Sequence, residues 1–140
     1  MANLRDLLDA DALNSLQMCP GTVLLGEMDG VDHLKFYVVA AVANDKVCIC
    51  SVIINSRINP FIQKRPHLLA RQVQINAADY DFLDHDSYIN CAQPWKVQAD
   101  YFHGFTQKGC LSDADLQRVR TEIINSGMLT DEERELYNLL

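Results

Sequence analysis

Hydrophobic and polar residues alternate along this chain with two periods, first that of a helix and then that of strands. Leucines recur at helical spacing over residues 3–17, which predicts a helix, and Pro20-Gly21 then interrupts the chain. Apolar and β-branched runs separated by turn residues follow. They predict strands at Thr22–Gly26, Leu34–Val42, Lys46–Ile54, Gln72–Ile75 and Ser87–Cys91, with Gln93-Pro94 ending the last one and Trp95–Val97 able to resume pairing.

Tight turns connect the first three predicted strands. Asp29-Gly30 and Asn44-Asp45 are turn dipeptides, so we expect an antiparallel meander. The second and third strands are apolar at almost every position, which is typical of strands buried on both faces in a small barrel or a covered sheet. Residues 55–64 are predicted as a loop, and Pro66 argues against a central strand after it.

Two helices are predicted after residue 111. Ser112 begins a capping pattern in which Asp115 replaces the usual Glu, and Gly127 ends this helix. Thr130 begins a full capping box and a short last helix that reaches Leu139. The fold class is therefore expected to be mainly β with α. We expect a single domain, 1–140, with a helical extension at 1–19, a β-barrel at 20–98, and a loop with C-terminal helices at 99–140.

The composition suits one small domain. The chain has 140 residues, 49% of them hydrophobic, which is enough for a core of its own. No apolar run approaches the roughly 20 residues of a membrane span, and the N-terminus lacks the basic start and apolar block of a signal peptide. An odd count of five cysteines then indicates reduced thiols. We expect a cytoplasmic protein with no membrane partner.

The cysteines and histidines do not have the spacing of a metal site. Cys48 and Cys50 are separated by one residue, not by the two usual in zinc knuckles, and on a strand both would point to the same face. We favour packing over a metal or redox role for this pair. The histidines also lack the close spacing of ligands on one element, so no metal or other cofactor is expected.

Charge is distributed unevenly along the chain. The net charge is −7, yet residues 46–78 contain no Asp or Glu and five basic residues, with His67 beside them. Such a segment attracts a phosphate backbone or an acidic partner peptide. The alternative is a solvated loop with scattered cations. The five are Lys46, Arg57, Lys64, Arg65 and Arg71.

Three short motifs carry a resemblance to a known family. They are Pro20-Gly21-Thr22-Val23, Ile89-Asn90-Cys91-Ala92-Gln93-Pro94 and Gly109-Cys110-Leu111-Ser112. In this order, over residues 20–126, they resemble the PemK/MazF/Kid toxins, which are endoribonucleases of bacterial toxin–antitoxin pairs. The resemblance implies an SH3-like barrel, a homodimer, an antitoxin protein as partner and single-stranded RNA as substrate.

The chain differs from the family at the residues that take part in RNA cleavage. An Arg and an acidic residue flank the Cys of the family strand, whereas Asn90 and Ala92 stand here. Ala92 cannot transfer a proton, and Asn90 can bond a phosphate but carries no charge. The family's Arg near the start of the second strand is matched only loosely by Lys35-Phe36. Cleavage by this chain would therefore use other groups.

Metal-independent RNA cleavage needs a base for the ribose 2′-OH, an acid for the leaving 5′-oxygen and a cation or donor cluster for the phosphorane. His85 is the sharpest candidate because histidine serves as acid or base near neutral pH, although a turn histidine is the alternative. Arg57 is the candidate cation, and the alternative interpretation is that it is a solvated cation in a loop. The predicted catalytic residues are Lys35, Arg57 and His85, and the predicted RNA- or partner-binding residues are His33, Asn55, Ser56, Lys64, Arg65 and Asn90.

Two functions remain open at this point. One is a MazF-like toxin that cleaves single-stranded RNA without a metal, through a rearranged site. The other is a toxin-like barrel without catalysis that acts by binding an antitoxin or another protein.

Overall fold

The computed structural model describes residues 19–27 and 33–139. The helix predicted at 3–17 and the turn predicted at Asp29-Gly30 lie outside these residues.

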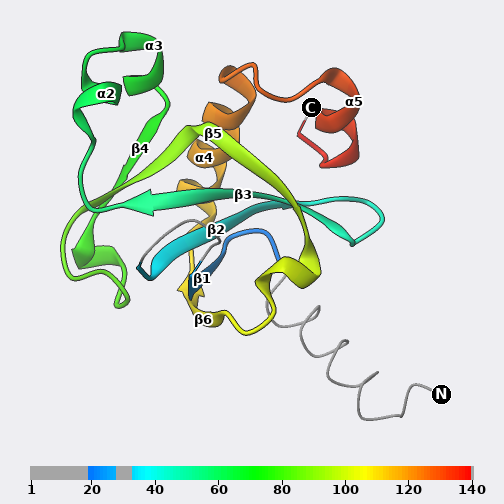
Figure 1. Cartoon of the computed structure of the whole chain (residues 1–140), viewed down its shortest axis with the longest axis horizontal. Helices are drawn as coiled ribbons and strands as arrows, with labels where there is room; N and C mark the ends of the chain where they lie inside the picture. Colours follow the sequence, from blue (N-terminus) through cyan, green and yellow to red (C-terminus); the bar gives the residue numbers. More distant parts are fainter. Residues whose placement is uncertain (1–18, 28–32, 140) are drawn as a thin grey trace.

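Six antiparallel strands form one curled sheet, an open half-barrel, in the order β4-β5-β3-β2-β1-β6 (Figure 1). The first three strands form the predicted meander, because β1 pairs with β2 and β2 with β3. All five predicted strands are present. The strands are β1 Thr22–Gly26, β2 Lys35–Val42, β3 Cys48–Asn55, β4 Gln72–Ile75, β5 Ser87–Gln98 and β6 Thr106–Cys110.

Strand β5 does not end at Gln93-Pro94, contrary to the prediction. Ser51 of β3 pairs with Trp95 and Ile53 pairs with Asn90, so the single residue Val52 stands opposite residues 91–94. This insertion is a bulge, and a bulge tolerates proline because no ladder hydrogen bond needs its missing N–H. Pro94 therefore lies within a continuous strand.

Strand β6 was not predicted, and it extends the sheet beyond the expected boundary at residue 98. It pairs with β1 at the edge of the sheet. Its sequence, Thr-Gln-Lys-Gly-Cys, does not alternate apolar and polar residues. Four of its five residues are exposed, so the strand needs no apolar face. An edge strand of this kind carries little sequence signal.

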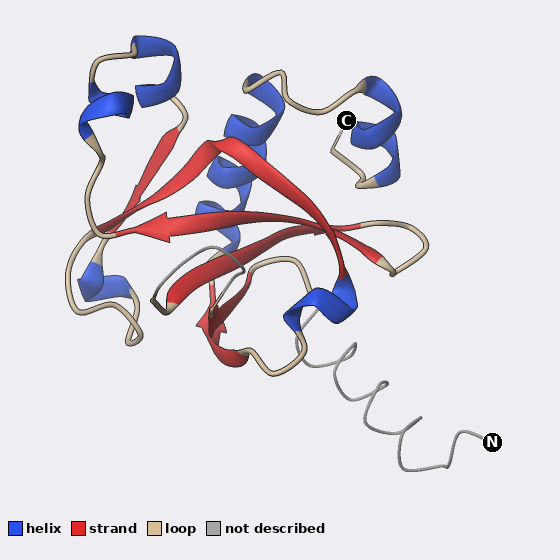
Figure 2. Cartoon of the chain, viewed as in Figure 1, coloured by secondary structure: helices blue, strands red, loops and turns tan. Residues whose placement is uncertain are grey.

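A short helix, α2, lies within the segment 55–64 that was predicted as a loop, and a second short helix, α3, follows it (Figure 2). Asn59 caps α2, its side chain accepting a hydrogen bond from the Ile62 backbone, and Pro60 follows at the first helical position. The Asn-Pro dipeptide thus starts a helix here.

The helices are α2 Pro60–Gln63, α3 Pro66–Leu69, η1 Ala77–Asp79, η2 Ala99–Phe102, α4 Asp113–Asn125 and α5 Asp131–Leu136. Among the described residues, none of the helices has the length and apolar character to cross a membrane.

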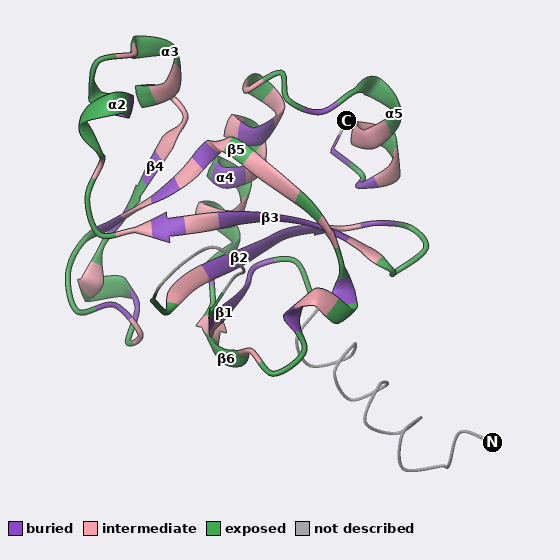
Figure 3. Ribbon diagram, in the orientation of Figure 1, coloured by how far each residue is buried: buried purple, intermediate pink, exposed green. Residues whose placement is uncertain are grey.

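The sheet has two packed faces, and β2 and β3 are buried along most of their length (Figure 3). On one face α4 lies behind the strands, and Val119 and Ile123 join the larger core cluster. Cys48 and Cys50 both pack into this cluster, which confirms that they share a face. On the other face, η2 covers a smaller cluster around Tyr37 and Phe102.

Tyr80 completes the N-terminal cap of α4. Ser112 accepts a bond from the Asp115 backbone at 3.2 Å, as predicted, but Asp115 does not reach back as in a capping box. Instead the Tyr80 hydroxyl accepts from the Ser112 backbone N–H at 3.0 Å and donates to Asp115 Oδ2 at 2.5 Å. One phenol therefore satisfies two groups at the helix start and ties α4 to the sheet.

Replacing Tyr80 by Phe is expected to lower the free energy of unfolding by about 1–3 kcal/mol, because the Ser112 backbone N–H and the half-buried Asp115 carboxylate lose their bonds to the buried phenol. Urea denaturation measures the change. Tyr37→Phe is the matched control, since the buried Tyr37 hydroxyl has no hydrogen-bond partner among the described residues and its removal should cost nothing. Equal losses in the two variants would contradict the assignment.

Candidate functional site

A cleft of about 190 Å³ lies where β2 begins, β3 ends and β5 begins. Its polar lining comes from three segments far apart in the sequence. The lining includes His33, Lys35, Ser56, Asp84, His85 and Ser87. Four of the predicted site residues are thus brought together.

The strand register creates this cleft. Phe36 pairs with Ile54, and Ile54 pairs with Ile89, so the three strand ends lie at one edge of the sheet. Antiparallel neighbours alternate in direction, and the start of β2 therefore adjoins the end of β3 and the start of β5. Phe36 and Phe82, with ring centroids 5.3 Å apart, form part of the apolar floor.

Lys35 is the best-positioned cation of the cleft. Its ammonium donates to Asn55 Oδ1 at 2.9 Å across the β2–β3 pair, and both side chains are half-buried. This bond uses one of the three N–H donors of the ammonium and fixes its direction. Asn55, predicted as a binding residue, is placed to orient Lys35.

His85 is exposed and lines the cleft from the loop before β5. The Asp86 carboxylate accepts from the Ala77 backbone at 2.8 Å, and the Ser87 hydroxyl donates to the His85 carbonyl at 3.0 Å. These bonds hold the loop on both sides of the imidazole. His33 lies across the cleft, just before β2.

Asp84 is a cleft residue that the sequence analysis missed. Its position next to His85 is the only signal that pointed to it. A carboxylate there adds a second proton acceptor and also places a negative charge beside any phosphate, so the cleft is mixed in charge rather than uniformly positive.

Other predicted residues lie outside the cleft. Arg57 is exposed beyond the end of β3 and is not among the lining residues. Arg65 stacks on the Phe61 ring, with its guanidinium carbon 3.4 Å from the ring centroid, and donates to the Phe61 carbonyl. Lys64 is exposed beside them at the end of α2.

The basic segment 46–78 does not form one patch. Lys46 lies in the turn before β3 and Arg57 after it, so the length of the strand, about 25 Å, separates them. Arg71 is paired with Glu122 at 2.7 Å. Of the remaining cations, Lys46, Arg57 and Lys64 are exposed, and Arg65 is half-buried against the Phe61 ring.

Asn90 lies on β5 at a second groove. Its Oδ1 accepts from Gln72 Nε2 at 2.9 Å and from the Ala92 backbone at 3.1 Å. This groove, of about 340 Å³, is lined largely by apolar side chains, including Phe61 and Met128. In the PemK/MazF/Kid toxins the strand that corresponds to β5 contains an Arg and an acidic residue. In this chain Asn90 and Ala92 stand at those positions, and β5 contributes no titratable group to the cleft.

The two buried cysteines, Cys50 and Cys91, are neutral thiols within the core. Burial raises the pKa of Cys50 to about 12, and it raises the pKa of Cys91 further, so both remain neutral thiols at physiological pH. No group of three or more His, Cys, Asp or Glu side chains within residues 19–27 and 33–139 is arranged to hold a metal.

No protein-family model matches the chain, and no curated protein matches it.

Native protein treated with iodoacetamide at pH 8 should be alkylated at the exposed Cys19 and Cys110 and spared at Cys50 and Cys91, because only the thiolate reacts and burial disfavours it. Mass spectrometry of the peptides measures the labelling. Denatured protein, in which all five cysteines react, is the control. Fast alkylation of Cys50 in the folded protein would contradict the packing described.

Proposed function

We propose that the chain is a MazF-like toxin of a toxin–antitoxin system that cleaves single-stranded RNA without a metal. The observation that supports this most is the cleft, which His33 and Lys35 line from the start of β2 and His85 lines from the loop before β5. Two imidazoles and an ammonium supply the acid, the base and the cation that this reaction needs. The curled sheet with its helices is compatible with the SH3-like barrel of that family.

The proposed reaction uses the RNA's own 2′-oxygen as nucleophile. One imidazole takes the 2′-OH proton, the oxygen attacks phosphorus, and the bond from phosphorus to the 5′-oxygen breaks. The other imidazole gives its proton to that 5′-oxygen. The products are a 2′,3′-cyclic phosphate and a 5′-hydroxyl, and Lys35 stabilises the phosphorane charge.

This site is rearranged relative to the family pattern. The missing Arg and acid at Asn90 and Ala92 are replaced by groups at the ends of β2 and β3 and before β5. Arg57, outside the cleft, is assigned to binding RNA. Homodimerisation, an antitoxin partner and a cytoplasmic location belong to the same proposal.

A second candidate is a barrel that acts by binding a protein. The observation that favours it is the groove beside Asn90, where Phe61 and Met128 are 57% and 56% exposed. Arg65 and Lys64 lie next to this groove, which would suit an antitoxin segment with acidic and apolar residues.

Purified protein should cleave a mixed-sequence RNA in the presence of EDTA. His85→Gln is expected to lower kcat by about 10²–10⁴-fold, the usual contribution of a general acid or base. Lys35→Met is expected to lower kcat by about 10²–10³-fold, the usual cost of losing one group that stabilises the transition-state charge. His67→Gln is the matched control, because His67 is an exposed histidine on α3 outside the cleft. Intact RNA after incubation with wild type would favour the binding protein instead, and full activity of His85→Gln would remove His85 from the site.

Arg57→Gln should weaken RNA binding without a comparable loss of kcat. Each phosphate contact that is lost removes about 0.7 from the slope of log affinity against log salt for a single strand. Fluorescence anisotropy at several salt concentrations measures this slope. A slope identical to that of wild type would show that Arg57 contacts no phosphate.

A further inference from the structure

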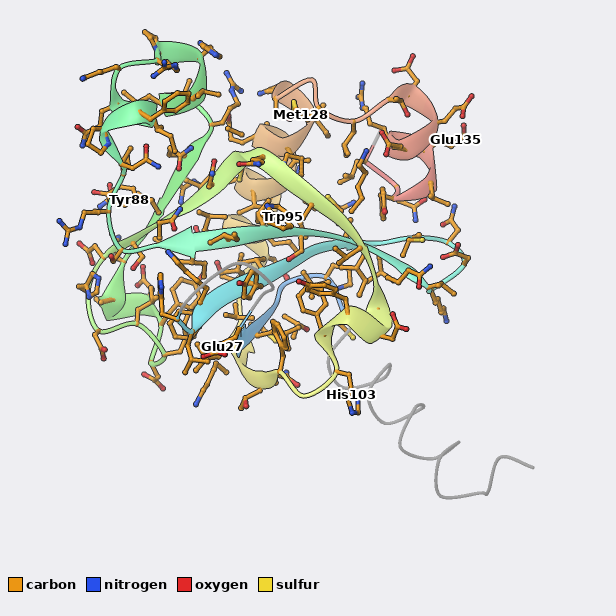
Figure 4. The ribbon with its side chains drawn as sticks, viewed as in Figure 1. Glu27, Tyr88, Trp95, His103, Met128 and Glu135 are labelled. Carbon is orange, nitrogen blue, oxygen red and sulfur yellow. The ribbon has the colours of Figure 1, made fainter. Side chains whose placement is uncertain are left out.

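On the face of the sheet opposite α4, the cluster under η2 covers β1, β2 and the first part of β3, whereas the side chains at the end of β3 and along β5 are only half-buried (Figures 1 and 4). Cross-strand partners share a face, so the register shows which side chains lie there. Lys35 and Tyr88 both flank Asn55, and Asn90 lies beside Gln72. We call this surface the open face, defined by Lys35, Asn55, Gln72, Tyr88, Asn90 and Trp95.

The bulge in β5 brings two aromatic rings onto the open face. Tyr88 and Trp95 are seven positions apart, and in a regular strand they would point to opposite faces. Tyr88 pairs with Asn55, however, and Trp95 pairs with Ser51, four positions along β3. The two rings therefore share a face at a separation of about 13 Å along the strand. Both are half-buried, and Figure 4 labels them on β5.

Between the rings, two amides present hydrogen-bonding groups. Gln72 Nε2 donates to Asn90 Oδ1 and to the Leu68 carbonyl. Among the described residues, nothing bonds the amide NH₂ of Asn90 or the amide oxygen of Gln72. The Asn90 NH₂ group can therefore donate hydrogen bonds, and the Gln72 amide oxygen can accept them. The edge of an unpaired base presents the complementary acceptors and donors.

The charges of the sheet are compatible with phosphate. None of the six described strands contains Asp or Glu, although the chain has 19 such residues. Lys35 lies on the open face, whereas Lys96 pairs with Cys50 on the opposite face and contacts Glu133. A strand of nucleic acid over this surface therefore meets a cation and amides, and no strand carboxylate.

We propose that the open face binds consecutive unpaired bases of single-stranded RNA, with Tyr88 and Trp95 as stacking platforms and the Gln72–Asn90 pair bonding a base edge. The inference rests on the proposed function, since Lys35 belongs to both the open face and the cleft, at the strand end where the two surfaces meet. RNA bound at the cleft would continue over the open face. Aromatic stacking holds bases with little sequence preference.

The test uses a 2′-O-methyl oligonucleotide of mixed sequence, which lacks the 2′-OH nucleophile and so separates binding from cleavage. The chain contains one tryptophan, so its emission reports on Trp95 alone. Saturable quenching of this emission is expected. Anisotropy of a labelled probe should show Tyr88→Ala and Trp95→Ala weakening binding by about 5–100-fold each, whereas Tyr88→Phe and Trp95→Phe, which keep a ring, bind nearly as wild type. Leu69→Ala, on the exposed surface of α3, is the control.

The outcomes separate this inference from the proposed function. Quenching and weakened variants without RNA cleavage would support the open face and overturn the catalytic proposal. Cleavage with unchanged KM in Tyr88→Ala and Trp95→Ala, and no quenching by the probe, would overturn the open face alone. A blue shift of Trp95 emission with protein concentration in the absence of RNA would also overturn it, because a second copy of the chain would then cover this surface.

Discussion

The pairing of β3 between β2 and β5 is the constraint on which the rest of this structure depends. It aligns three strand ends at one edge, where the cleft forms, and it sets the bulge opposite Val52. Because a pleated strand alternates its side chains, each added residue changes the face of all that follow. The bulge therefore decides both the core packing of β5 and the side chains that it presents on the open face.

The fold was largely predictable from the sequence, because most strands bury an apolar face. Strands β1 and β4 have the predicted bounds, and the capped starts of α4 and α5 are confirmed. Strand β6 was missed because an exposed edge strand carries polar residues, and Pro94 concealed the continuity of β5. A proline is a break only where its N–H would be needed.

The candidate site was predictable in part. The candidates at the ends of strands two and three and before the Cys strand proved to be neighbours, because an antiparallel register brings such ends together. Arg57 did not join them, since a residue past a strand end takes its direction from the loop. The relation of Tyr88 to Trp95 was not predictable, because sequence spacing places them on opposite faces unless the bulge is known.

The central claim is that the cleft directs the RNA's own 2′-oxygen against the adjacent phosphate. Mass spectrometry of the RNA ends formed by wild-type protein in EDTA tests this most directly. Attack by the 2′-oxygen produces fragments ending in a 2′,3′-cyclic phosphate paired with fragments that begin with a 5′-hydroxyl. Fragments with a 3′-hydroxyl and a 5′-phosphate would contradict it, because they require attack by water rather than by the ribose.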